Sequence, residues 1–106
     1  MNEPILNATA SAQLVITPGD LASALSLDAQ EAFPALLATA RMVALMEIAS
    51  ARLLRPHLAA GELSVGVHLD VNHSAPPPPP GAPVTATARY LGREGKLFIF
   101  EGGILG

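Results

Sequence analysis

The stretch ATARMVALMEIASARLLRPHL, residues 38–58, decides the fold of this chain. Alanine, leucine and methionine dominate it, and these residues are among the strongest helix formers. Its large apolar side chains lie nearly all round a helical cylinder, so we expect the helix to be covered on most of its sides. Pro56 and Gly61 mark its end. The sequence therefore predicts one long, largely buried helix around which the rest of the chain folds.

The residue pattern changes after this helix. In SVGVHLDVNHSAPPPPPG, residues 64–81, apolar and polar residues alternate. This is the pattern of a half-buried strand, and it extends over residues 64–73. Residues 83–91 and 96–101 predict two further strands, which a turn at residues 92–95 joins into a hairpin.

The segment before the helix begins with AQLVIT, residues 12–17, a short strand candidate. Asp20 can cap a short helix over residues 21–27. A strand, a buried helix and a run of antiparallel strands indicate an α+β fold, in which one antiparallel sheet wraps around one long helix. We expect a single domain over residues 1–106. Because a five-stranded sheet of this kind leaves an exposed edge, we also expect a homodimer.

Composition excludes several classes of function. Six basic and nine acidic residues give a net charge of −3, without the cluster of lysine and arginine that nucleic-acid binding requires. There is no cysteine, which excludes a thiolate metal site and a cysteine nucleophile. The longest apolar segment, residues 36–54, contains Arg41, Glu47 and Arg52, which disfavours a membrane span. The N-terminus lacks the pattern of a secretory signal, so a cytoplasmic protein is expected.

The run of prolines at residues 76–80 has two interpretations. It can form the polyproline II helix that SH3-type domains bind. It can also be a stiff connector between two strands, which needs no partner. No basic residue flanks the run, as such ligands usually require, and the connector is therefore favoured.

Few residues carry chemistry by themselves. His57 follows Pro56 at the helix end, where a cation suits the helix dipole. His68 and Asp70 share the polar face of a strand, but two ligands are too few for a metal site. His73 takes a core-facing position, either as a buried histidine bonded to a carbonyl group or as a functional group. Glu47 lies in the middle of the apolar helix, where a carboxylate needs a partner or a task.

Two motifs, MVALMEIA in the helix and SVGVHLDVNHSAPPPPPG after it, resemble the fluoroacetyl-CoA thioesterase-like family of hot-dog-fold proteins. The resemblance covers residues 10–100. In that family a threonine, a glutamate and a histidine form the catalytic group, and the resemblance assigns these roles to Thr39, Glu47 and His73. It also places Gly66 beside the acyl substrate and makes Phe33 an aromatic gate of the acyl pocket. No metal or other cofactor is implied.

The chain departs from the family pattern at two places. A second gate phenylalanine, three residues before Phe33, is replaced by Gln30, so a general small acyl-CoA is expected rather than a fluorinated one. The C-terminal residues GGILG, 102–106, resemble the start of a final strand, with several residues missing before Gly102. We expect either a deletion or a sequence that stops before the end of this strand.

The spacing of Thr39 and Glu47 limits how the catalytic group can act. On one straight helix, eight residues would separate them by roughly 12 Å, too far for both to touch one reacting atom. Thr39 is therefore expected as the N-cap of a helix that starts at Ala40, where nearby N–H groups could bind an oxyanion. A plain structural cap remains open, and so does a site shared between two subunits.

These observations predict a homodimeric thioesterase that hydrolyses a small acyl-CoA near Glu47 and His73. The sequence leaves open whether Glu47 attacks the thioester directly or activates water, while His73 would manage the proton. The alternatives are a non-catalytic acyl-CoA-binding hot-dog domain and an interaction module that uses the proline run.

Overall fold

The computed structural model describes residues 3–62 and 80–105. Three strands and one long helix make up its regular structure, with three short 3₁₀ turns between them. In chain order the elements are β1 (Thr9–Val15), η1 (Pro18–Asp20), η2 (Ala22–Leu25), α1 (Thr39–Leu54), η3 (Arg55–His57), β2 (Pro83–Glu94) and β3 (Leu97–Leu105). The predicted strand 64–73 and the proline run lie outside the described residues.

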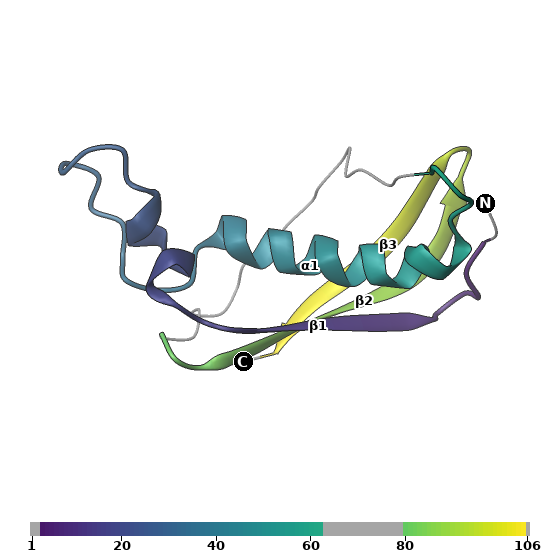
Figure 1. Ribbon diagram of the computed structural model, residues 1–106, viewed down its shortest axis with the longest axis horizontal. Coiled ribbons are helices and arrows are strands. Elements are labelled where there is room, and N and C mark those ends of the chain that lie inside the picture. The colour runs from purple at the N-terminus through teal and green to yellow at the C-terminus, as the bar shows by residue number, and fades with distance from the viewer. Residues whose placement is uncertain (1–2, 63–79, 106) are drawn as a thin grey trace.

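The described strands form one antiparallel sheet in the order β1-β2-β3. α1 lies along one face of this sheet, and the hairpin tip between β2 and β3 is near the C-terminal end of the helix (Figure 1). The chain between β1 and α1 extends beyond the N-terminal end of the helix in the same view. The α+β class, one long helix on an antiparallel sheet, is thus confirmed.

The core lies between α1 and the inner face of the sheet. Small residues dominate the strands there, and Ala12 pairs with Ala86 while Ala88 pairs with Gly102. Small side chains allow the helix to approach the sheet closely, and larger helix residues fill the space. A Cβ atom added to Gly102 would stand 3.0 Å from the Sδ atom of Met46. The main buried residues are Ala12, Ile16, Leu21, Leu37, Met42, Leu45, Ala49, Val84, Ala86 and Ala88.

The outer face of the sheet is largely polar, which explains why the helix packs on one side only. Thr87 and Arg89 of β2 alternate with the fully buried Ala86, Ala88 and Tyr90. An exposed ion pair joins the Arg89 Nη2 atom to the Glu101 Oε1 atom at 2.9 Å. The strand predicted over residues 83–91 is therefore confirmed, and it extends to Glu94.

Only one face of α1 is buried within the described chain. Met42, Leu45 and Ala49 point into the core, whereas Glu47 and Ile48 are exposed. A helix on a one-sided sheet presents its opposite face to the outside, because side chains repeat every 3.6 residues. The described strands therefore cover one side of the helix, and the strand predicted over residues 64–73 lies outside the described residues.

The hairpin is longer than the sequence predicts. Its turn is the two-residue loop Gly95-Lys96, with Gly95 at φ 60°, which matches the twist of the flanking strands. A bulge follows Tyr90, where Gly92 adopts φ 129°. β3 continues without a break to Leu105, which pairs with Thr85. The expectation that GGILG begins a separate strand is therefore wrong.

Candidate active site

Thr39 is the first residue of α1, and Ala38 is the N-cap. Ala38 has an extended backbone (φ −66°, ψ 138°), and its carbonyl oxygen accepts the N–H groups of Arg41 and Met42 at 3.0 Å each. The predicted N-cap role of Thr39 is thus wrong by one residue. Since alanine cannot cap with its side chain, the start of this helix is stabilised from elsewhere.

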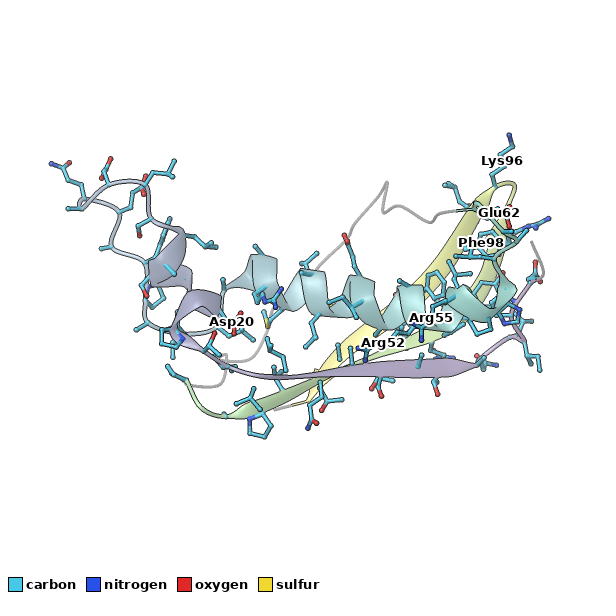
Figure 2. All side chains as sticks on the ribbon, viewed as in Figure 1. Asp20, Arg52, Arg55, Glu62, Lys96 and Phe98 are labelled. Carbon is cyan, nitrogen blue, oxygen red and sulfur yellow. The ribbon has the colours of Figure 1, made fainter. Side chains whose placement is uncertain are left out.

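Asp20 supplies this stabilisation from the turn that follows β1. Its main-chain oxygen accepts the Ala38 N–H at 2.9 Å, and its Oδ1 atom accepts the Nε–H of Arg41 at 2.8 Å. Its Oδ2 atom accepts the N–H and the hydroxyl of Thr17 at 2.8 and 2.9 Å. Figure 2 shows Asp20 at the N-terminal end of α1. One buried carboxylate therefore connects the end of β1 with the first turn of the helix.

The hydrogen bonds of Asp20 favour its charged form. Those from Thr17 and Arg41 together lower the pKa of the Asp20 carboxyl below its ordinary value of 3.8, with the Thr17 N–H as the largest cause. Burial acts in the opposite direction but does not outweigh them. The carboxylate therefore stays ionised, and paired with Arg41, throughout the neutral range.

Phe33 belongs to the loop between β1 and α1. Two hydrogen bonds close the base of this loop. The N–H of Ala22 donates to the oxygen of Leu36 at 2.7 Å, and the N–H of Ser23 donates to the oxygen of Pro34 at 3.1 Å. Its outer part exposes large apolar side chains, and Phe33 is 50% exposed. An aromatic ring on a loop with a fixed base can face a ligand without filling the core.

Glu47 lies in the middle of α1 on the exposed face. Position 47 points away from the three described strands, so these strands do not bury the carboxylate. Thr39 and Glu47 share one continuous helix, so about 12 Å separates them along the axis and about 80° around it. Two groups so placed cannot contact the same thioester carbonyl from one chain.

The remaining predicted residues are only partly covered by the structure. His73 and Gly66 lie outside the described residues, and so do His68 and Asp70. His57 is half-buried and ends η3, one short turn beyond the end of α1. Within residues 3–62 and 80–105, no group of three histidine, aspartate or glutamate side chains is placed to hold a metal ion. In the same ranges no helix has the length and apolar character needed to cross a membrane.

Sequence reasoning missed the link between Asp20 and Arg41. It interpreted Asp20 as the cap of a following helix and Arg41 as an interruption of an apolar segment. A local signal was present, because Thr17 and Asp20 have the spacing of a capping box. The 21-residue separation of Asp20 and Arg41 left no comparable signal.

The family model described as fluoroacetyl-CoA-specific thioesterase (FlK) matches residues 16–104. A fluoroacetyl-CoA thioesterase from Streptantibioticus cattleyicolor is 45% identical over 64 residues, which is 60% of this chain and 45% of the relative. The match thus spans less than half the length of that curated relative. The solved structure of the fluoroacetyl-CoA thioesterase FlK superposes with a TM-score of 0.87 at 32% identity, covering 98% of this chain and 78% of that one. A threonine-to-serine variant of FlK in complex with acetyl-CoA superposes with a TM-score of 0.85 at 31% identity. This match covers 94% of this chain and 76% of that one.

Proposed function

Because the chain belongs to the fluoroacetyl-CoA-specific thioesterase family and has the hot-dog fold of its structural relatives, we propose that it hydrolyses a small acyl-CoA to the free acid and CoA. One observation carries the proposal. α1 lies within the span that the family model matches and presents Thr39 at its first turn and Glu47 at its exposed midpoint. These are two of the three residues to which the family resemblance assigns the catalytic roles.

The proposed reaction uses Thr39, Glu47 and His73. Glu47 either attacks the thioester carbonyl, forming an acyl–glutamyl anhydride that water later hydrolyses to the free acid, or removes a proton from the attacking water. The carbon–sulfur bond then breaks, and His73 supplies the proton that the leaving thiolate takes up. Thr39 contacts the substrate near the carbonyl oxygen, where the N-terminus of α1 favours negative charge. The relative solved with acetyl-CoA carries a threonine-to-serine change, the residue type that the family resemblance assigns to Thr39.

The proposed active unit is a homodimer. Glu47 and Ile48 lie on the exposed face of α1, and β1 and β3 form the edges of the described sheet. Exposed apolar helix faces and free sheet edges are the surfaces that a second copy can cover. The 12 Å between Thr39 and Glu47 supports the same assembly. A site that combines Thr39 of one copy with Glu47 of the other would bring both groups to one thioester.

The proposed substrate is a small acyl-CoA without a requirement for fluorine. Phe33 lines the acyl pocket in this proposal, and Gly66 lies beside the acyl group. Gln30 takes the place of the second gate phenylalanine of the family, so one side of the gate is polar and flexible. We therefore expect acetyl-CoA and propionyl-CoA to be turned over, with no large preference for fluoroacetyl-CoA.

A cytoplasmic location of the protein also remains a prediction.

The test is the release of free CoA from acyl-CoA esters of increasing chain length. Turnover of short esters by the wild-type chain, and its loss in the Glu47→Gln variant, would support the proposal. Calorimetric binding of acyl-CoA without any release would instead favour a non-catalytic acyl-CoA-binding domain. Binding of SH3 domains to the full chain, without affinity for CoA esters, would favour an interaction module built on the proline run.

A further inference from the structure

Asp20 holds the start of α1 at two points. Its main-chain oxygen accepts the N–H of Ala38, the N-cap, and its carboxylate accepts the Nε–H of Arg41 in the first turn. Thr39 lies between these two points. Its main chain is thus bracketed by residues that are both bonded to Asp20.

Asp20 is itself fixed. Its second carboxylate oxygen accepts both hydrogen bonds from Thr17, and the residue is only 8% exposed. Leu21, the next residue, is buried in the core and pairs with Leu37 across a short antiparallel bridge. A charged, buried acceptor with these partners has little freedom to move. It is a rigid support rather than a surface contact.

The first turn of α1 lacks two of the groups that usually stabilise a helix start. Ala38 makes no side-chain cap, and no acidic residue occurs in the first turn. Arg41 places a positive charge close to the positive end of the helix dipole, which is unfavourable when the charge is unpaired. Asp20 offsets that charge, so the pair helps to order this turn.

We propose that the ion pair between Asp20 and Arg41 is a positioning element for Thr39, which fixes the first turn of α1 so that Thr39 meets the thioester in one orientation. This inference rests on the proposed function, in which Thr39 contacts the substrate. Reactive groups need placement within a fraction of an ångström, and a displacement of about 1 Å can cost about 100-fold in rate. Asp20 and Arg41 touch no substrate in this proposal. They act through the geometry of Thr39.

A double-mutant cycle between Arg41 and Thr39 tests the proposal. Arg41→Gln should lower kcat at least about tenfold when Thr39 is present, and less than about twofold in the Thr39→Ala background. Arg41→Lys keeps the charge and should recover part of the loss. Arg89→Gln is the matched control, because Arg89 is also 40% exposed and paired with one carboxylate. It should leave kcat unchanged in both backgrounds.

The opposite result is an equal loss of kcat in both backgrounds, as a general defect of folding would give. That result, or no loss at all, overturns the proposal. Hydrogen exchange provides a readout that does not depend on activity. Exchange at the amides of Ala38 and Met42 should quicken at least about tenfold in Arg41→Gln and stay unchanged in Arg89→Gln. If the wild type hydrolyses no CoA ester, the proposed function fails, and unchanged exchange at these amides would then separately overturn the positioning role.

Discussion

Thr39 and Glu47 lie on one continuous helix, eight residues and about 12 Å apart along its axis. The helix is unbroken from Thr39 to Leu54, so no bend brings the side chains of Thr39 and Glu47 together. In the proposed mechanism, a second copy of the chain therefore supplies one of them to each reaction centre. The distance along this helix therefore connects the chemistry of the site with the assembly of the protein.

Mixing two impaired variants should restore activity if the site is shared. A chain with Thr39→Ala and a chain with Glu47→Gln would each lack one group at every site. A mixed dimer would hold one complete site, so an equal mixture after exchange of subunits should recover about a quarter of the wild-type kcat. CoA release measured before and after refolding the mixture checks this. No recovery, in a sample that sedimentation shows to be dimeric, would contradict a site shared between two chains.

Glu47→Gln and His73→Ala should each lower kcat at least about 100-fold, the usual size of a general acid–base contribution. The fold should survive Glu47→Gln, because this side chain is exposed and fills no core volume. Thermal unfolding followed by circular dichroism measures the stability of each variant. His57→Ala is the control and should retain wild-type turnover, because His57 lies beyond the end of α1. Wild-type turnover in Glu47→Gln would contradict the proposed mechanism.

The sequence predicted the type of each described element better than its limits. The long helix was clear because alanine, leucine and methionine, which favour a helix, fill nine of the sixteen positions from residue 39 to residue 54. β1 begins at Thr9 rather than at residue 12 because Thr9 and Ala10 have partners on β2, which local propensity does not contain. In the same way, pairing with β2 carries β3 as far as Leu105.

The candidate site was predictable only in part. A carboxylate in an otherwise apolar helix is conspicuous in the sequence, and Glu47 was predicted as a site residue partly for this reason. Its exposure was not predicted, because the sequence does not say which face of the helix the sheet leaves uncovered. Asp20 and Arg41 come together because hydrogen bonds close the base of the loop between β1 and α1. A contact of this kind produces no periodic pattern in the sequence.

Asp20→Asn should destabilise the protein at neutral pH and much less in acid. The lowered pKa of Asp20 means that its ionised form stabilises the fold. Its contribution is complete above its ordinary pKa of 3.8 and is lost as the pH falls through the lowered value. We expect a loss of about 1–3 kcal/mol in the free energy of unfolding at pH 7, the usual cost of losing hydrogen bonds to a charged group.

Urea unfolding at several pH values measures this difference. The gap between wild type and Asp20→Asn should be constant from pH 7 to about pH 4 and should narrow below it. Glu101→Gln is the control, because the exposed pair with Arg89 should contribute less than about 1 kcal/mol. A gap that stays the same at pH 2 would show that the charge of Asp20 does not stabilise the fold.

Gly102→Val should push the midpoint of α1 away from the sheet, because a Cβ atom added at Gly102 would stand 3.0 Å from the Sδ atom of Met46 and 3.4 Å from its Cγ atom. Overpacking of this kind typically costs about 1–3 kcal/mol. Met46 precedes Glu47, so the displacement should also lower kcat. Gly103→Val is the matched control, since a Cβ atom there meets nothing within 4 Å, and valine suits a strand. Adding Met46→Ala to the Gly102→Val variant removes the crowded side chain and should recover part of the lost stability and part of the lost kcat. Equal melting temperatures for the two valine variants would show that α1 does not depend on this close approach.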